Sequence, residues 1–256
     1  MSVSLCAKLV LVVSCVFSLP AAWKEVSKGF RFEKLLVVKG KRAVLAPREL
    51  LRQEFHYLGQ GTQSYVFESG DGKYVLKLFR FEQATNPIYC FVRMRLRGKP
   101  LRLSRQAQVE RLFSACRIAD QLAREETALL FLHLEESEVG TVRLHLPFRG
   151  TVELCLDRCC FVLQEKGERI FPSLLASNLE ERGRKLDSFQ TLLQKRAVKG
   201  ITNLDSDLHR NFGFIGERAI EIDFGAYEMV SREEAEKNQL HFTKKLQAWL
   251  DENRVE

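Results

Sequence analysis

Four side chains with oxygen atoms that suit metal-dependent chemistry lie close together in the second half of the sequence. They are Asp205, Asp207, Asn211 and Asp223. The first three precede an apolar run at 212–215, and the fourth follows a second apolar run at 219–222, with the turn 216–218 between them. This pattern predicts a β-hairpin, which would bring the four side chains together at its open end. Carboxylate and amide oxygens bind Mg²⁺, and a carboxylate can act as a general base. The segment therefore predicts a base beside a magnesium site, an arrangement that serves phosphoryl transfer.

An upstream segment predicts strands that would complete such a site. The range 55–69 contains Gly59 and Gly61 in its middle, and the turn 71–72 leads into a strongly β-forming run at 73–81. The order is strand, glycine loop, strand, tight turn, strand. Backbone N–H groups of a glycine loop can cover phosphates. A pair of glycines between two strands is weak evidence alone, because it is more often only a turn.

Together the two segments resemble the glycine loop, strand lysine, catalytic loop and D-F-G motif of protein kinases. Gly59 and Gly61 match the first two loop glycines, and Ser64 stands in the place of the third. Lys77 matches the strand lysine, which the resemblance assigns to the phosphates of ATP. Asn211 and Asp223 match the residues that hold Mg²⁺. The D-F-G motif itself is residues 223–225.

The resemblance leaves the base open between two aspartates. Kinase catalytic loops place the base five residues before the metal-binding asparagine, and Ser206 occupies that position here. Asp205 lies one residue too far from Asn211 and Asp207 one residue too near. We favour Asp205, because it directly follows the apolar entry 201–204, and keep Asp207 as the alternative. A catalytic loop that has degenerated, as in a pseudokinase, is the third reading.

A helix predicted over 104–126 stands where a kinase places the helix whose glutamate pairs with the strand lysine. Ser104 is the expected N-cap, and the apolar residues that follow keep helical spacing. Glu110 is the candidate partner of Lys77, because it is early in the helix and beside the apolar stripe. Asp120 and Glu125 are its rivals, and each of these carboxylates is otherwise an ordinary solvated charge.

The expected fold is α+β and two-lobed, of the protein-kinase-like type with a truncated C-lobe. Short β runs at 128–134, 141–146, 152–156 and 159–164 would complete a β-rich N-lobe around the long helix. A helical stretch over 171–196, interrupted near Gly183, and a helix over 232–251 capped by Ser231 would form a small, mostly helical C-lobe carrying the hairpin. Expected boundaries are 23–54 for an N-terminal extension, 55–166 for the N-lobe and 167–256 for the reduced C-lobe.

The N-terminal residues 1–22 predict a signal peptide or a membrane-attaching segment. Lys8 precedes an apolar run at 9–19 that ends in small residues at 20–22. The sequence therefore favours an exported or membrane-attached protein. The alternative is a cytoplasmic protein in which this run is a helix packed on the domain.

The composition limits the kinds of ligand and binding partner that the sequence supports. The 256 residues carry a formal net charge of +7 and 45% hydrophobic residues, which supports a folded core and anionic ligands. The sequence has no dense block of basic residues, so it does not predict nucleic-acid binding. The seven cysteines include no C-x-x-C pair of the kind that binds zinc.

The resemblance implies a phosphotransferase that uses ATP and Mg²⁺ to modify an unknown protein, small-molecule or glycolipid acceptor. The alternative is a nucleotide-binding or inactive pseudokinase that acts as an exported or scaffold binding protein.

Overall fold

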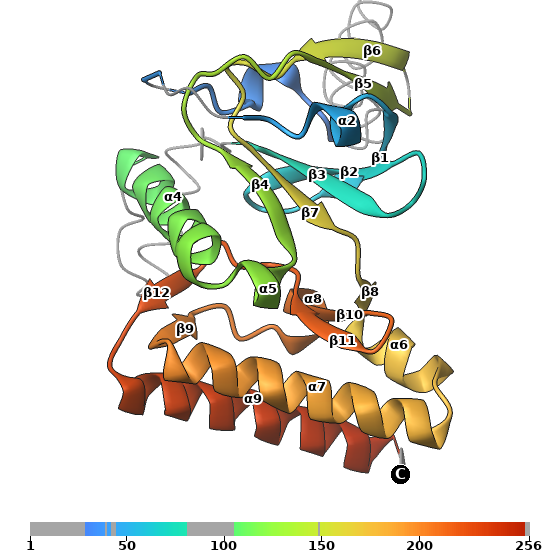
Figure 1. The fold of residues 1–256 in the computed structure, drawn as a ribbon, viewed down its shortest axis with the longest axis vertical. Helices are drawn as coiled ribbons and strands as arrows, with labels where there is room; N and C mark the ends of the chain where they lie inside the picture. The colour runs from blue at the N-terminus through green and yellow to red at the C-terminus, as the bar shows by residue number, and fades with distance from the viewer. Residues whose placement is uncertain (1–28, 39, 42–44, 81–104, 148, 254–256) are drawn as a thin grey trace, which may run out of the picture. The chain divides into compact units, whose positions relative to one another are not determined.

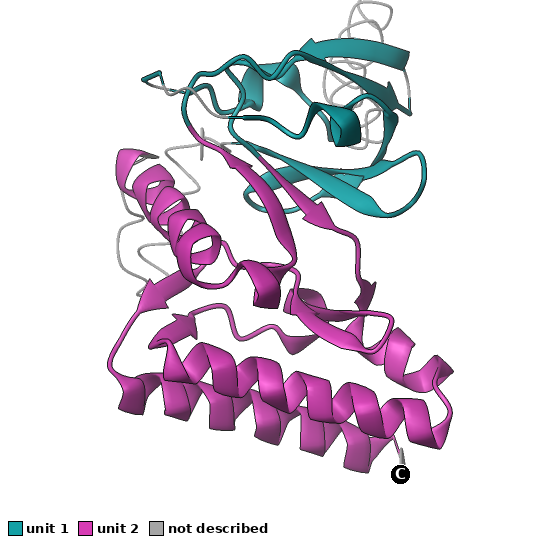
Figure 2. Ribbon diagram, in the orientation of Figure 1, with its two compact units in different colours: residues 1–82, 135–161 teal, residues 83–134, 162–256 magenta. Residues whose placement is uncertain are grey.

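The computed structural model describes residues 29–38, 40–41, 45–80, 105–147 and 149–253 (Figure 1). They form an α+β protein with a mixed β-sheet, two smaller sheets and several helices. The predicted targeting segment 1–22 and the segment 81–104, which includes the expected N-cap Ser104, lie outside the described residues. The chain divides into two compact units: unit 1 comprises residues 1–82 and 135–161, and unit 2 comprises residues 83–134 and 162–256 (Figure 2).

Unit 1 is built on a twisted run of five neighbouring strands in the order β3-β2-β1-β5-β6. Their bounds are β1 Glu54–Gln60, β2 Ser64–Ser69, β3 Tyr74–Phe79, β5 Thr141–Leu146 and β6 Gly150–Cys155. β1 runs parallel to β5, and the other pairs are antiparallel. Alternate residues of β2 and β5 are buried, which is the period-two pattern of strands with one face on a core. A 3₁₀ turn, η1 (Phe32–Lys34), and the short helix α2 (Arg48–Leu51) complete the described part of this unit.

Unit 2 contains most of the helices. They are α4 Arg105–Leu122, α5 Arg124–Thr127, α6 Ile170–Ala176, α7 Leu179–Val198, α8 Leu208–Asn211 and α9 Arg232–Glu252. Its strands are β4 Leu129–His133, β7 Phe161–Glu165 (which begins at the last residue of unit 1), β8 Glu168–Arg169, β9 Ile201–Asn203, β10 Phe212–Ile215, β11 Arg218–Glu221 and β12 Tyr227–Met229. β4 neighbours β7, β12 pairs with β9, and β10 lies between β11 and β8.

The core of unit 2 forms between its two longest helices and the central hairpin. α7 and α9 lie side by side, as Figure 1 shows. The buried residues Phe189, Phe212 and Phe242 come from α7, β10 and α9, and their rings meet edge to face. Burying large aromatic side chains removes much apolar surface from water, so this contact fixes the hairpin on the helices.

One glycine is required by the close packing of the hairpin. A Cβ built on Gly213 in β10 would lie 2.2 Å from the carbonyl oxygen of Glu168 in β8. The neighbouring atom belongs to the backbone, so it cannot swing aside. Only glycine therefore lets β8 and β10 pair.

Several predicted elements are confirmed. β10 and β11 form the expected antiparallel hairpin, and β1, β2 and β3 lie where strand, loop, strand, turn, strand was predicted. The helix α9 begins after Ser231, whose side chain accepts the N–H of Glu234 as an N-cap. β4, β5, β6 and β7 match the four predicted β runs to within a few residues.

The predicted interruption of the 171–196 helix near Gly183 is wrong. The break comes earlier, between α6 and α7, and Gly183 lies inside α7. Asn178 starts α7 with a capping box, because its side chain accepts the N–H of Glu181 while the Glu181 side chain accepts the N–H of Asn178. The cap decides where the helix begins, and a single glycine in a long helix is tolerated.

The helix predicted over 104–126 is also shorter than expected. α4 ends at Leu122, Ala123 leaves helical geometry, and the separate turn α5 follows. Ala128 then adopts a left-handed conformation with φ of 52°, which turns the chain into β4. Local spacing of apolar residues does not reveal this corner, because the apolar stripe reaches Ala123 and α5 itself contains no apolar residue.

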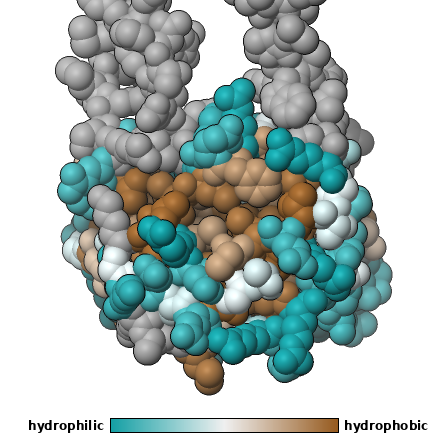
Figure 3. Space-filling view, turned by 90° about the horizontal axis from the view of Figure 1, so that it is seen from above, coloured by the Kyte–Doolittle hydropathy of each residue, from teal (hydrophilic) through white to brown (hydrophobic). Residues whose placement is uncertain are grey.

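Within the described residues, no helix is long and apolar enough to cross a membrane. Figure 3 shows one face of the molecule, on which hydrophobic residues gather in a central area surrounded by hydrophilic ones. Large exposed apolar side chains in unit 1 include Val37, Leu45 and Leu58. Apolar atoms make up a large share of any protein surface, so these residues carry no functional assignment.

Candidate active site

The β10–β11 hairpin brings the predicted metal ligands to one end. Its register pairs Phe212 with Glu221, so Asn211 and Ile222 flank the last pair. The carbonyl oxygen of Asn211 accepts the N–H of Ile222 at 2.6 Å and that of Asp223 at 3.3 Å. Residues that are twelve positions apart in the sequence are therefore joined through their backbones.

Asn211 is almost fully buried, with 1% of its surface exposed. Its side-chain Nδ2 donates to the carbonyl oxygen of Asp205 at 3.0 Å, but its Oδ1 has no hydrogen-bond partner among the described residues. Leaving a buried acceptor unsatisfied costs free energy of about 1–3 kcal/mol. A buried polar atom of this kind calls for an explanation, and a bound cation is one.

The two candidate bases have different surroundings. Asp205 is exposed, and its Oδ1 accepts the N–H of Asp207 at 3.1 Å. Asp207 is the N-cap of α8: its Oδ1 accepts the N–H of Arg210 at 3.1 Å, and its Oδ2 lies 3.0 Å from Arg210 Nε. Both carboxylate oxygens of Asp207 are therefore engaged within its own turn. The carboxylate of Asp205 accepts only one hydrogen bond from the described residues.

Asp223 lies just after the second strand of the hairpin and is exposed. Its Oδ1 accepts the N–H of Gly225 at 3.0 Å, which closes a short turn over Phe224. Phe224 is buried, so the turn is held from below by packing as well. The D-F-G segment thus presents one carboxylate from a fixed backbone.

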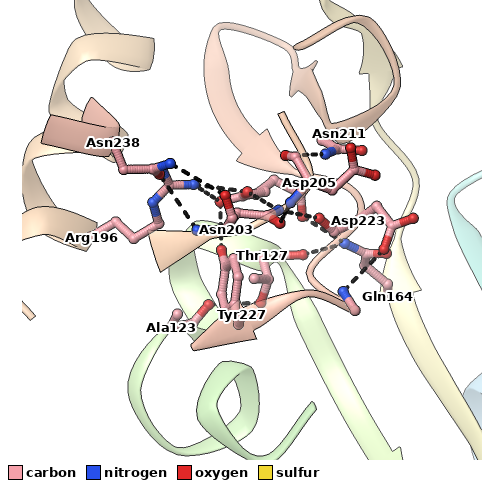
Figure 4. A network of polar contacts seen from close by, with 12 residues as sticks. Ala123, Thr127, Gln164, Arg196, Asn203, Asp205, Asn211, Asp223, Tyr227 and Asn238 are labelled. Carbon is pink, nitrogen blue, oxygen red and sulfur yellow. Dashed lines mark hydrogen bonds and ion pairs between the residues drawn. The ribbon is translucent and has the colours of Figure 1, made fainter. Parts of the chain in front are cut away.

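Asn203 at the end of β9 connects these elements, and sequence reasoning missed it (Figure 4). Its Oδ1 accepts the N–H of Asp205 at 2.9 Å, and its Nδ2 donates to the carbonyl oxygen of Asp223 at 2.9 Å. One buried side chain therefore ties the candidate base to the candidate metal ligand. In the sequence, Asn203 belongs only to the mostly apolar segment 201–204 that precedes Asp205.

A buried ion pair lies behind Asn203. Glu221 and Arg196 have side chains that are 0% and 1% exposed, and Arg196 Nη1 lies 2.6 Å from Glu221 Oε2. Asn203 Nδ2 donates to Glu221 Oε1 at 2.7 Å, and the hydroxyl of Tyr227 donates to Glu221 Oε2. Burial, and next the charge of Glu221, raise the pKa of Tyr227 well above its ordinary value. The phenol therefore keeps its proton and remains a donor.

The glycine-loop residues lie in unit 1, between β1 and β2. Gly59 has a φ of 155° at an irregularity in the β1–β2 pairing. The N–H of Gly61 donates to the carbonyl oxygen of Ser64 at 2.8 Å, which closes the connection. The buried Arg80 donates from Nε to the Gly61 carbonyl oxygen at 3.1 Å and from Nη1 to Gln60 Oε1 at 2.7 Å. This loop is therefore fixed by an arginine that the sequence did not single out.

The remaining predicted site residues are placed on separate elements. Lys77 lies in β3 of unit 1, paired with Val66 of β2, and is half-buried. Glu110 lies in α4 of unit 2, is exposed, and accepts a hydrogen bond from Gln106 Nε2 at 2.9 Å. Its pairing with Lys77 stays a prediction. Of the two rival carboxylates, Asp120 forms an ion pair with Arg124, and Glu125 Oε2 lies 3.4 Å from Lys195 Nζ.

The structure thus gathers Asp205, Asp207, Asn211 and Asp223 at one end of the hairpin in unit 2. Gly59, Gly61, Ser64 and Lys77 belong to unit 1. No group of three or more histidine, cysteine, aspartate or glutamate residues with metal-binding geometry occurs among the described residues. A magnesium site here would instead rely on an amide and a carboxylate, with water completing the shell, which is usual for Mg²⁺.

Comparisons with known proteins show limited similarity. No protein-family model matches the chain, and no curated protein sequence matches it. Among solved structures, the chain is similar to the co-crystal structure of WbdD and the kinase inhibitor LY294002, with a TM-score of 0.38 and 17% sequence identity. The similarity covers 67% of this chain and 32% of that one, so the chain spans about a third of the length of that protein. The described residues have the α+β architecture that the sequence predicted.

Proposed function

We propose that this protein is an atypical kinase-like phosphotransferase that moves the γ-phosphoryl group of ATP, with Mg²⁺, to an acceptor. The observation that carries the proposal is the setting of Asn211. Its Nδ2 holds the backbone of Asp205, while its buried Oδ1 has no hydrogen-bond partner in the part of the chain that the structure describes. One side chain thus links a candidate base to an acceptor atom that suits a cation.

The residues present fit a magnesium ion. Mg²⁺ binds oxygen ligands and takes only one or two of them from carboxylates, keeping water and phosphate oxygens for the rest. Asn211 would contribute Oδ1 and Asp223 its carboxylate, of which Oδ1 already accepts the Gly225 N–H. When bound, the ion would neutralise charge on the phosphates. The backbone bonds between Asn211 and Asp223 hold these two ligands in one place.

Asp205 is the better base on the geometry. Both carboxylate oxygens of Asp207 are engaged by Arg210, so Asp207 is occupied as a helix cap. Asp205 is exposed, and its backbone is fixed on both sides, by Asn203 at the N–H and by Asn211 at the carbonyl oxygen. A base on a fixed backbone can hold the proton of an acceptor hydroxyl without prior rearrangement.

Unit 1 would bind the nucleotide. We assign Gly59, Gly61 and Ser64 to the phosphates through backbone N–H groups, and Lys77 to the phosphate charge, with Glu110 orienting Lys77. The acceptor is a protein, a small molecule or a glycolipid. Export, or membrane attachment through residues 9–19, remains part of the proposal, and nucleic acid is not an expected partner.

A second candidate is a nucleotide-binding protein without turnover. The spacing of the catalytic loop favours it, because Ser206 and not an aspartate stands five residues before Asn211. In this case the fold would serve as a scaffold or an exported binding module.

The test is ATP turnover by the purified full-length chain with Mg²⁺. Lys77→Ala and Asp223→Ala should each lower the rate by about a hundredfold or more, because each removes a preorganised electrostatic contact. Lys73→Ala, an exposed lysine next to the same strand, is the matched control and should leave the rate unchanged. Binding of Mg-ATP without turnover would favour the second candidate, and equal rates in all variants would reject the site.

A further inference from the structure

The carboxylate of Glu221 is completely buried and surrounded by hydrogen-bond donors. It is 0% exposed and accepts hydrogen bonds from three side chains, those of Arg196, Asn203 and Tyr227. Burying an ion pair carries a large desolvation cost, and an apolar pair of similar volume often gives equal or greater stability. The two buried charges are therefore better explained by the groups that they contact than by a contribution to the free energy of folding.

Two acceptors, one of them the charged carboxylate of Glu221, select the orientation of the Asn203 amide. Around Asn203 Nδ2 lie Glu221 Oε1 at 2.7 Å and the carbonyl oxygen of Asp223 at 2.9 Å, and both atoms can only accept hydrogen bonds. Turned by half a rotation, the amide would place Oδ1 against these two acceptors. The observed orientation leaves Oδ1 facing the N–H of Asp205.

Arg196 selects the orientation of a second amide in the same way. Its guanidinium can only donate, and its Nη2 donates to Asn238 Oδ1 on α9. Asn238 Nδ2 then donates to the carbonyl oxygen of Asn203 at 3.3 Å, while Asn238 Oδ1 accepts the N–H of Asn203 at 3.4 Å. The amide of Asn238 thus holds the backbone of Asn203 (Figure 4). The carboxylate of Glu221 holds the side chain of Asn203.

We infer that the buried Arg196–Glu221 pair positions the candidate active site through Asn203 and Asn238. Each charge fixes one amide, and the two amides fix the segment that presents Asp205 and the backbone of Asp223. Arg196 and Glu221 are positioning residues in this account, because neither contacts the reacting groups. Their catalytic meaning rests on the proposed function, but their effect on Asp205 does not.

The first test is Glu221→Gln, read by hydrogen exchange of the Asp205 amide in nuclear magnetic resonance spectra. A glutamine keeps the shape but presents both a donor and an acceptor, so Asn203 Nδ2 loses its charged acceptor and the side chain of Asn203 is held less firmly by its remaining partners, the Asp223 carbonyl oxygen and the Asp205 N–H. We expect exchange at Asp205 to speed up at least tenfold beyond any change in core amides such as that of Phe189. Tyr227→Phe is the control, because it removes one bond to Glu221 and leaves the partners of Asn203 in place. Equal exchange at Asp205 in the two variants would overturn the inference.

A second variant covers the case in which Glu221→Gln fails to fold. The double substitution Arg196→Met with Glu221→Leu removes both charges and leaves neither partner buried alone. We expect a folded protein with accelerated exchange at Asp205 and at least a tenfold loss of Mg-ATP affinity. Unchanged exchange in this variant would refute the positioning role. If the wild type binds no Mg-ATP, the proposed function fails, while the exchange data still decide this inference.

Discussion

The side-chain amide of Asn211 donates a hydrogen bond to the carbonyl oxygen of Asp205 at 3.0 Å. This bond spans the turn of α8 and places the two residues on one fixed piece of backbone. If a residue were inserted or removed between Asp205 and Asn211, the loop would have to change its conformation to keep this hydrogen bond. The bond therefore gives a structural reason to favour Asp205 as the proposed base, although its spacing from Asn211 departs from the protein-kinase pattern.

Replacing each candidate base separates their roles. Asp205→Asn should lower ATP turnover by at least a hundredfold with little change in the unfolding temperature, because the carboxylate is exposed. Asp207→Asn should keep most of the activity, since asparagine caps helices as well as aspartate does. Steady-state kinetics beside thermal unfolding checks both variants. Equal losses of turnover in the two would show that neither acts as the base.

The buried oxygen of Asn211 gives a prediction on metal dependence. Asn211→Ala removes Oδ1 together with the bond to Asp205, so the Mg²⁺ concentration for half-maximal nucleotide binding should rise at least tenfold. Asn253→Ala is the control, because it also removes an amide that donates to a backbone carbonyl, that of Trp249, at an exposed helix end. Fluorescence titration with Mg²⁺ at fixed ATP measures the effect. An unchanged midpoint in Asn211→Ala would remove this residue from the site.

Two glycines should respond in opposite directions to the same substitution. Gly213→Ala places a methyl group 2.2 Å from a backbone carbonyl, so it should lower the free energy of unfolding by about 1–3 kcal/mol. Gly183→Ala lies inside α7, where the added carbon meets no described atom within 4 Å apart from the neighbouring backbone of its own helix, and should raise it by about 0.5–1 kcal/mol. Urea unfolding measures both. A neutral Gly213→Ala would mean that β8 does not hold the hairpin as described.

Buried thiols make stability depend on alkaline pH. Burial, followed by the neighbours Cys155 and Asp157, raises the pKa of Cys159 to about 11, and burial, followed by Cys159, raises that of Cys160 to about 12. Well below pH 9.0, the ordinary thiol pKa, both thiols stay protonated in the folded and unfolded states. Above it the unfolded chain ionises first, so the free energy of unfolding should fall as pH rises from 9 toward 12.

Urea unfolding at pH 8 and pH 10 tests this dependence. The double variant Cys159→Ala with Cys160→Ala should show a smaller loss of stability between the two pH values than the wild type. Tyr57, whose pKa burial raises to about 12, provides a common background in both proteins. Identical losses would show that the thiols do not contribute.

Local patterns predicted the elements of the fold that depend on neighbouring residues. The turn 216–218 between two apolar runs predicted the hairpin, and Ser231 before an amphipathic stretch predicted the start of α9. The break between α6 and α7 was misplaced, because Gly183 is a weaker signal than the capping box at Asn178. The short strands β8, β9 and β12 were not predicted, since pairing with distant strands is what defines them.

The candidate site was predictable only where side-chain type carries the chemistry. Asp205, Asp207, Asn211 and Asp223 could be selected from the sequence, because oxygen ligands at hairpin ends suggest a metal site. Asn203 and Arg80 could not, since an asparagine after a short apolar run and an arginine after a strand have no distinctive spacing. Their roles follow from contacts across many residues, from Asn203 to Asp223 and from Arg80 to Gly61.

The central claim is that Asn211 and Asp223 hold Mg²⁺ for a bound nucleotide, and calorimetric titration of the full-length chain with ATP tests it most directly. We predict binding that requires Mg²⁺ and disappears in excess EDTA. Asp223→Ala should weaken this binding at least tenfold, whereas Asp251→Ala, at an exposed position on α9, should bind as the wild type does. Absence of heat with the wild type, or equal affinity with Mg²⁺, with EDTA and in Asp223→Ala, would contradict the account.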